Sequence, residues 1–135
     1  MNTTDGSSAE LQPLADLDHD APIYHLALPE EWTAAITDGQ YCISTRAMSL
    51  DEVGYIHCST KDQVETVANN FYGDLDLLMH LTIDPRLVPS EIRFEPPAPA
   101  SPLLFPHIYG PLPIKAVNLA RPWTREVSGW SLQSL

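Results

Sequence analysis

The chain of 135 residues carries a formal net charge of −11, from 18 acidic and 7 basic side chains, and 44% of its residues are hydrophobic. This charge argues against nucleic-acid binding, which needs a basic surface, and against docking on anionic membranes, and no apolar run reaches the roughly 20 residues of a membrane span. A domain of this size buries enough apolar surface to fold without a disulfide or a structural metal.

The first half of the chain predicts one strand and two helical segments. Residues 1–21 are polar and acidic, which predicts a disordered N-terminal arm. A strand is expected at 23–28, followed by a helix from Pro29 to about Gly39, because proline suits the first helical turn and glycine suits the end. An extended segment at 41–44 then leads to Ser49 and Glu52, whose spacing is that of a capping box for a helical turn.

The second half predicts a longer helix and most of the strands. A strand is expected at 55–59, and the i, i+3, i+4, i+7 spacing of Val64, Val67, Ala68 and Phe71 predicts an amphipathic helix that ends at Gly73. Further strands are expected at 75–83, 91–95, 103–109 and 114–119. The pattern predicts a single α+β domain over residues 22–123, with a small mixed or antiparallel split sheet and two to three helices, followed by a C-terminal tail at 124–135. It leaves the oligomeric state open.

Strand alternation predicts which side chains share a face, because residues two apart point the same way. In the segment GYIHCST, Tyr55, His57 and Ser59 should therefore share one face, while Cys58 points to the opposite, apolar side. This favours a buried structural cysteine over a nucleophile paired with His57. Two cysteines without CxxC spacing fit a reduced, cytoplasmic setting.

Other polar side chains are expected to gather near this face. Arg93 and Glu95 share a face of their strand, and His25 faces away from its apolar neighbours. His107 and Tyr109 lie between Pro106 and a Gly-Pro turn, and rigid segments of this kind often line binding sites. If these faces converge, they form one cleft for a small-molecule ligand that carries His25, Tyr55, His57, Ser59, Arg93 and Glu95. The segment with His107 and Tyr109 either lines this site or forms a packed structural turn with Phe105 and Tyr109 in the core. His80, on an apolar strand, is expected to be a buried histidine with its hydrogen bonds satisfied.

The segments IYHLAL, SLDEVGYIHCST, RFEP and FPHIYGPL, in this order between about residues 22 and 123, resemble the domain of unknown function 952 family. That family is grouped with folds like those of the ADP-ribosyltransferases, in which two small sheets meet around a cleft that binds NAD. The resemblance implies that His25 holds the nicotinamide ribose and that His57, with Ser59, lies beside the nicotinamide. The related folds also have a glutamate in the site. No residue of this chain matches that glutamate cleanly, and Glu95 is the candidate to replace it.

Three hypotheses follow for the cleft. The first is an NAD-related enzyme for ADP-ribosyl transfer or glycohydrolysis, with catalytic candidates His25, His57, Glu95 and His107 and with NAD contacts from His25, Tyr55, Ser59, Arg93 and Tyr109. The second is a non-catalytic module that binds a nucleotide or another small ligand. The third is a metal-dependent enzyme with three histidine ligands, His25, His57 and His107. No HExxH or HxH spacing supports the third hypothesis, so no metal ligand is assigned.

The first hypothesis has a chemical basis. A carboxylate stabilises the positive charge that develops on ribose when the nicotinamide–ribose bond breaks. Imidazoles can bind the ribose hydroxyls or move protons near neutral pH. The fork of donors on Arg93 or Arg46 suits the pyrophosphate.

Overall fold

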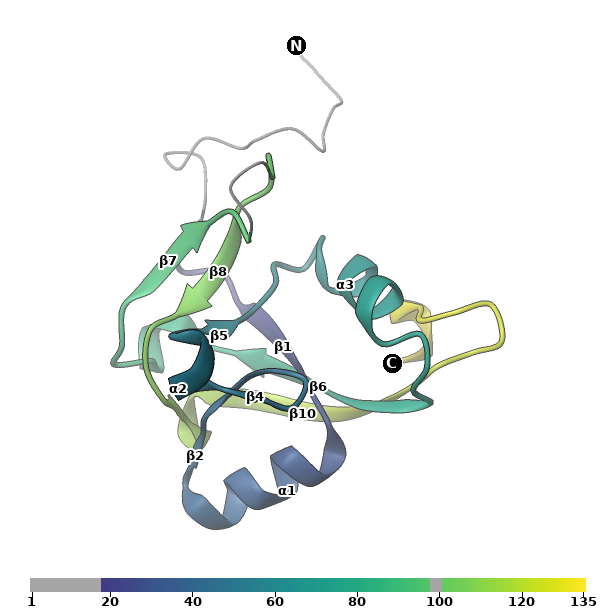
Figure 1. Cartoon of the computed structure of the whole chain (residues 1–135). Helices are drawn as coiled ribbons and strands as arrows, with labels where there is room; N and C mark the ends of the chain where they lie inside the picture. Colours follow the sequence, from purple (N-terminus) through teal and green to yellow (C-terminus); the bar gives the residue numbers. More distant parts are fainter. Residues whose placement is uncertain (1–17, 98–100) are drawn as a thin grey trace.

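The computed structural model describes residues 18–97 and 101–135 (Figure 1). Residues 1–17 of the predicted N-terminal arm and residues 98–100 of the proline-rich loop lie outside the described residues. Three α-helices and several small antiparallel sheets make up the described part of the chain. This confirms the predicted α+β class, whereas the likeness to the ADP-ribosyltransferase fold stays a prediction.

The first sheet has β6 (Leu77–Ile83) at its centre, between β1 (Ile23–Ala27) and β10 (Val117–Thr124). Both neighbours are antiparallel to β6. Alternate residues of β1 pack on opposite sides of this sheet, with Ile23 and Ala27 in one hydrophobic core and Leu26 in another. The central strand is apolar along its length because both faces of the sheet are covered.

The second sheet has β8 (Phe105–Ile108) at its centre, between β5 (Ile56–His57) and β7 (Ile92–Glu95). Two short antiparallel pairs complete the strands: β2 (Gln40–Tyr41) with β9 (Leu112–Pro113), which are distant in the sequence, and β3 (Ile43–Thr45) with β4 (Met48–Ser49). The two larger sheets are joined where Tyr24 and Ser59 exchange two backbone hydrogen bonds of 2.8 Å. This junction places the end of β5 beside β1.

Two of the helices begin and end where the sequence predicts caps. α1 (Pro29–Asp38) begins with proline and ends at Gly39, whose φ of 91° is a left-handed conformation that glycine adopts without a steric penalty. α2 (Leu50–Val53) has the expected capping box, in which the Ser49 hydroxyl accepts from the Glu52 amide. α3 (Val64–Phe71) ends at Tyr72, one residue before the predicted stop.

Two hydrophobic cores lie on the two sides of the β1–β6–β10 sheet. The first packs α1, through Trp32 and Ala35, against that sheet and the second sheet. The second packs α3 against Trp123 of β10 and against Trp130, whose indole N–H donates to the Tyr72 carbonyl at 3.0 Å. Figure 1 shows the C-terminal segment beside α3, which agrees with these contacts.

The last strand differs from the predicted one at both ends. Ile114–Ala116 forms a 3₁₀ turn instead of the expected beginning of a strand, and the Ala116 carbonyl accepts from the Asp84 amide at 2.9 Å. The strand then continues to Thr124, through Pro122. Proline is tolerated there because β10 is an edge strand, where a missing N–H leaves no ladder partner unpaired.

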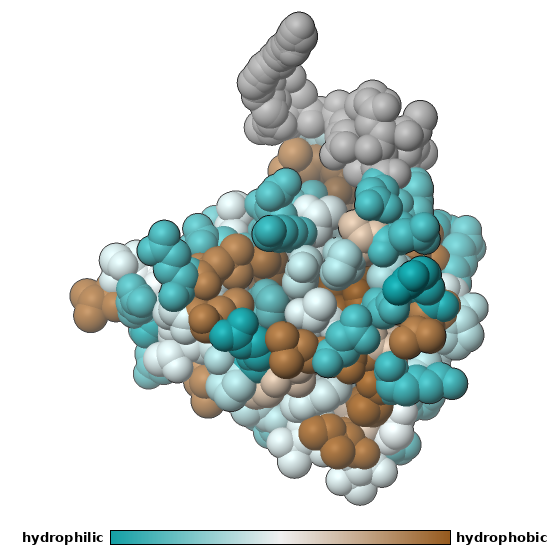
Figure 2. Space-filling view, turned by 180° about the vertical axis from the view of Figure 1, so that it is seen from behind, coloured by the Kyte–Doolittle hydropathy of each residue, from teal (hydrophilic) through white to brown (hydrophobic). Residues whose placement is uncertain are grey.

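The surface carries apolar residues that are interrupted by hydrophilic ones, as the rear view shows (Figure 2). The exposed large apolar side chains belong to different elements and loops and include Ile36, Met48, Phe71, Leu87 and Val127. None of the helices in the described residues combines the length and apolar character that crossing a membrane requires.

Candidate functional site

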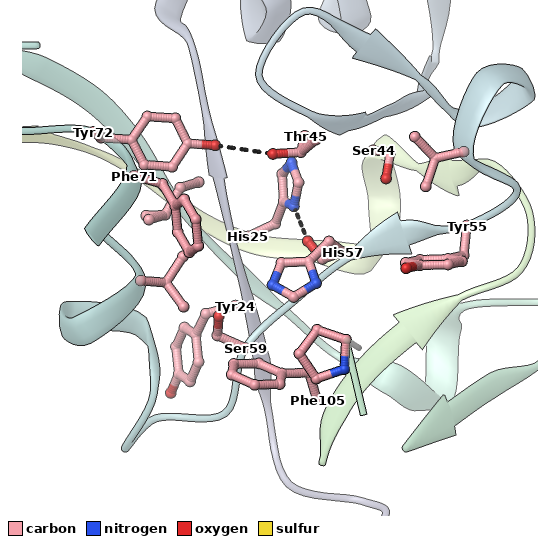
Figure 3. Close-up of a pocket in the computed structure, with 14 residues that line it drawn as sticks. Tyr24, His25, Ser44, Thr45, Tyr55, His57, Ser59, Phe71, Tyr72 and Phe105 are labelled. Atoms are coloured by element: carbon pink, nitrogen blue, oxygen red, sulfur yellow. Dashed lines mark hydrogen bonds between the residues drawn. The ribbon is translucent and has the colours of Figure 1, made fainter. Parts of the chain in front are cut away.

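A cleft of about 250 Å³ opens where the two larger sheets meet (Figure 3). Its walls come from β1, β3, β5, α3 and the loops around them. Aromatic rings form much of the surface, and His57 projects among them. The lining residues are Tyr24, His25, Leu26, Ser44, Thr45, Val53, Tyr55, His57, Ser59, Val67, Phe71, Tyr72, Pro97 and Phe105.

Strand register explains why His57 meets His107. On the second sheet, His57 of β5 is directly opposite His107 of β8, which is in turn opposite Arg93 of β7. Side chains at directly opposed positions lie on the same face and within contact distance. A hydrogen bond of 2.9 Å from the Cys58 amide to the Pro106 carbonyl extends this pairing by one residue.

A chain of hydrogen bonds links Glu95, His107 and His57. His107 Nδ1 lies 2.9 Å from Glu95 Oε1, and His107 Nε2 lies 3.2 Å from His57 Nδ1. His107 is fully buried. Burial raises the pKa of Glu95, but hydrogen bonds from Tyr109 and His107 outweigh it and hold the pKa below its usual value. The carboxylate at the end of the chain is therefore ionised at neutral pH.

The proton positions follow from this charge. An ionised carboxylate only accepts hydrogen bonds, so the proton of His107 is on Nδ1 and its Nε2 accepts from His57 Nδ1–H. This leaves the lone pair of His57 on Nε2, which has no hydrogen-bond partner among the described residues. Burial, with smaller effects of His107 and His25, lowers the pKa of His57 to about 4. His57 is thus a neutral imidazole with a free acceptor nitrogen in the cleft.

His25 holds the backbone of His57 and does not offer a free nitrogen. Its Nδ1 lies 2.6 Å from the His57 carbonyl oxygen, which only accepts, so Nδ1 is the donor. Its Nε2 then accepts from the Tyr41 hydroxyl at 2.8 Å. His25 is only 3% exposed, and burial lowers its pKa to about 4. Both nitrogens therefore have protein partners, although the ring contributes to the wall of the cleft.

Tyrosines and an arginine surround the other side of the chain. The ring of Tyr55 stacks on His107 with centroids 3.9 Å apart. The Tyr109 hydroxyl donates to the same oxygen of Glu95 that His107 contacts. The Arg93 guanidinium lies 4.3 Å from the centroid of the Tyr109 ring and forms a salt bridge of 3.0 Å with Glu91. These contacts fix the rings of His107 and Tyr109 around the carboxylate.

The structure brings most of the sequence-predicted residues together in two adjoining groups. His25, Tyr55, His57 and Ser59 line the cleft. Glu95, His107 and Tyr109 form the group behind it, which contacts the lining residues His57, through a hydrogen bond, and Tyr55, through ring stacking. Arg93, a candidate contact for NAD, is exposed and is not among the lining residues, and Arg46 is bound to Asp74 at the surface.

Sequence reasoning missed Tyr41, Ser44 and the aromatic walls of the cleft. Tyr41 and Ser44 lie in the segment predicted only as extended, and no local pattern distinguishes them from other polar residues. Tyr24, Phe71 and Phe105 had the appearance of core residues because they occur at apolar positions of a strand and a helix. His80 is buried as expected, but its Nδ1 has no hydrogen-bond partner among the described residues, which differs from the expectation of a satisfied histidine.

The cysteine and metal hypotheses can be compared with the same geometry. Cys58 is 1% exposed within the first core and points away from His57, which confirms the predicted structural role, and burial raises the pKa of its thiol. Over residues 18–97 and 101–135, no three His, Cys, Asp or Glu side chains are grouped in a way that could hold a metal ion. The three-histidine zinc hypothesis therefore has no support from the described residues.

Comparison with solved structures shows the same fold in protein CC0527 from Caulobacter crescentus. Its X-ray structure is 24% identical in sequence, with a TM-score of 0.70, and the match covers 82% of this chain and 92% of that one. The X-ray structure of a double mutant is 25% identical, with a TM-score of 0.70. The solution NMR structure is 22% identical, with a TM-score of 0.66 and coverage of 82% and 91%. A search of curated proteins finds no match.

A family comparison identifies residues 26–120 with the family described as "Protein of unknown function (DUF952)". This segment includes β2 to β9, the end of β1 and the first half of β10, and it contains every member of the Glu95–His107–His57 chain. The match agrees with the resemblance found in the sequence segments. The chain belongs to the domain of unknown function 952 family.

Proposed function

We propose that this protein is an acid–base enzyme that binds a small, ring-containing ligand in the cleft and uses His57 as its general base. One observation carries the proposal: the hydrogen-bond chain from Glu95 through His107 ends at His57, a neutral imidazole in the cleft whose Nε2 has no partner within residues 18–97 and 101–135. A general base needs a lone pair within reach of the substrate and a partner that stabilises the charge it acquires. His57 meets both of these conditions, and its pKa of about 4 makes it a weak base that is unprotonated at neutral pH.

The chain gives a proton a defined route. When His57 Nε2 accepts a proton, the ring carries a positive charge that its buried surroundings disfavour. The proton on Nδ1 can then move to His107 Nε2, 3.2 Å away. The positive charge is thereby transferred to His107, which lies 2.9 Å from the Glu95 carboxylate. Burial lowers the pKa of His107, and the nearby Glu95 carboxylate offsets part of this effect by stabilising the imidazolium.

The walls of the cleft favour a ligand with a ring. Tyr24, Phe71 and Phe105 offer aromatic faces around His57. Ring pairs gain stability from stacked or edge-to-face arrangements beyond the burial of area. The cleft volume of about 250 Å³ is at the small end of ligand sites, which suits a fragment of a nucleotide better than a complete dinucleotide.

Within this class we propose cleavage of the nicotinamide–ribose bond of NAD, with hydrolysis favoured over transfer. His57 and Ser59 lie together in the cleft, in agreement with the roles implied by the resemblance. Glu95 lies behind His107, so it is not positioned beside a bound sugar. The activation of water by His57 is therefore a better supported role than direct stabilisation of the ribose cation by a carboxylate.

The experiment combines calorimetric titration of NAD and ADP-ribose with a measurement of nicotinamide release. The wild-type protein is compared with His57→Gln and with His19→Gln, which changes an exposed histidine outside the cleft. We expect the loss of the general base to reduce the rate of release by about 10²- to 10⁴-fold, whereas His19→Gln has no effect. Failure of NAD to bind or to release nicotinamide contradicts the proposed reaction.

The alternative is a binding module without catalysis. The paired nitrogens of His25 and the apolar majority of the cleft walls agree with that alternative. The protein is a binding module if it binds NAD or ADP-ribose without releasing nicotinamide and if His57→Gln leaves this binding unchanged. Equal rates of release in the wild-type protein and in His57→Gln exclude His57 as the base.

A further inference from the structure

Ser44 has a buried hydroxyl without a hydrogen-bond partner. It lies on β3, its exposed fraction is 0%, and no partner for its Oγ is found in the part of the chain that the structure describes. Ser44 lines the same cleft as His57, and Figure 3 shows its hydroxyl directed into the cleft on the side of Tyr55. The orphaned hydroxyl therefore lies in the wall of a ligand site and not in the centre of a core.

An unpaired buried hydroxyl is costly, because it has lost its hydrogen bonds to water without gaining others. The buried histidines of this region are paired: both nitrogens of His25 and both nitrogens of His107 have partners. Buried polar groups in proteins nearly always have a hydrogen-bond partner. Ser44 Oγ is the one fully buried side-chain oxygen or nitrogen without a partner among the described lining residues, whereas the unpaired His57 Nε2 is not fully buried. This exception in the wall of a cleft points to a partner that arrives with the ligand.

The charge of the cleft limits what that partner can be. None of the lining residues in the described chain is Asp, Glu, Lys or Arg. Arg46, next in sequence to a lining residue, forms two hydrogen bonds of 2.8 and 2.7 Å with Asp74 and so is already neutralised. A carboxylate or phosphate in the cleft would lose its hydration without gaining a counter-ion, in a protein whose net charge is −11.

We infer that the cleft selects a planar ring that carries an uncharged polar substituent, such as a carboxamide or a ring carbonyl, and that Ser44 Oγ hydrogen-bonds this substituent. The aromatic walls hold the ring, and any anionic part of the ligand stays outside the cleft. This inference rests on the proposed binding of a ring-containing ligand in the cleft but not on the reaction. It gives Ser44 the role of a specificity residue.

The first test needs no ligand and measures thermal unfolding of Ser44→Ala. Because the substitution removes an unpaired hydroxyl, we expect an unchanged Tm or an increase of about 2–4 °C. The matched control is Ser49→Ala, which loses the N-cap hydrogen bond of α2 and should lower the Tm by about 2–4 °C. A similar decrease for Ser44→Ala means that its hydroxyl has a structural partner, and this overturns the inference.

The second test uses nicotinamide and nicotinate, which have the same ring and differ in the charge of the substituent. Backbone amide resonances of Ser44, Tyr55 and His57 are followed by NMR during titration. We expect nicotinamide to bind at least about tenfold more tightly than nicotinate, and Ser44→Ala to weaken nicotinamide binding by about fivefold or more. The inference is overturned by any one of three results. These are equal affinities for nicotinate and nicotinamide, no effect of Ser44→Ala on the affinity for nicotinamide, or no binding of nicotinamide.

These outcomes are independent of the proposed reaction. If wild-type protein releases nicotinamide from NAD but Ser44→Ala binds nicotinamide normally, the role of Ser44 is wrong and the function of His57 stands. If nicotinamide binds through Ser44 while His57→Gln changes no rate, the ligand class is correct and the proposed acid–base function is wrong.

Discussion

The imidazole of His57 lies 3.2 Å from the imidazole of His107, Nδ1 to Nε2, although 50 residues separate them in the sequence. The register of β5 against β8 creates this contact. It converts two histidines and one glutamate into a single hydrogen-bonded unit with one end in the cleft and the other at the half-buried Glu95 carboxylate.

The low pKa of His57 predicts an unusual pH dependence of its chemical reactivity. Diethyl pyrocarbonate modifies the neutral form of imidazole. Because the pKa of His57 is lowered to about 4, its rate of modification at pH 5.5 should equal that at pH 7.5. A model imidazole such as N-acetylhistidine should retain only about a tenth of its neutral fraction at pH 5.5. Mass spectrometry of the modified peptide measures the rate, and a decrease at pH 5.5 that parallels N-acetylhistidine contradicts the prediction.

Glu95 should contribute to stability through its hydrogen bonds to His107 and Tyr109. Glu95→Ala leaves the buried His107 Nδ1 without an acceptor, so we expect the free energy of unfolding to fall by about 1–3 kcal/mol. Glu95→Gln keeps an acceptor and should cost less than half as much. Urea denaturation of both variants checks this. Equal effects of the two substitutions would mean that charge, not the hydrogen bond, maintains the arrangement.

Tyr41 should be required to keep His25 in place. Its hydroxyl is the only described partner of His25 Nε2, at 2.8 Å, in a site where both rings are buried. Tyr41→Phe leaves this nitrogen unpaired and should lower the free energy of unfolding by about 1–3 kcal/mol. Tyr24→Phe is the control, since its hydroxyl has no partner in the described residues, and should change stability by less than about 0.5 kcal/mol. Similar values for the two variants would contradict the assigned role of Tyr41.

Acid should destabilise the protein over a defined interval. Burial lowers the pKa of both His25 and His57 from 6.5 to about 4. Between these values the unfolded chain binds protons that the folded chain does not, so the free energy of unfolding decreases as the pH falls from about 6.5 to 4. The two histidines together should account for a loss on the order of 5 kcal/mol.

Thermal melts at pH 7.5, 6 and 5 measure this loss. His57→Gln should reduce the acid-dependent decrease, because one of the histidines whose pKa burial lowers is removed, while His25, His80 and His107 still resist protonation in the folded state. A Tm that is constant between pH 7.5 and 5 would show that neither histidine has a lowered pKa.

Elements defined by local chemistry could be predicted from the sequence. The proline and glycine that bound α1, and the Ser49–Glu52 capping box of α2, involve residues a few positions apart. The alternation along β5 correctly placed Tyr55, His57 and Ser59 on the cleft side and Cys58 in the core. These features depend on backbone geometry that neighbouring residues fix without the rest of the fold.

The cleft itself depends on contacts that no local pattern contains. The meeting of His57 and His107 requires the register of two distant strands, and the Tyr41–His25 hydrogen bond requires β2 to cross beside β1. The extension of β10 through Pro122 was missed because the tolerance for proline depends on being an edge strand. The alternation of side chains along the strands identified the candidate histidines. Only the tertiary structure distinguishes His57, the proposed base, from His25 and His107, which hold it in place.

The most direct measurement is the tautomeric state of the histidine rings, from long-range proton–nitrogen NMR spectra at pH 7. The account predicts that His57 and His107 are both neutral with the proton on Nδ1, and that Glu95→Ala changes the nitrogen shifts of both rings. A proton on Nε2 of His57 would place the lone pair toward His107 and leave no base in the cleft. That result would contradict the proposed general base, whatever the ligand.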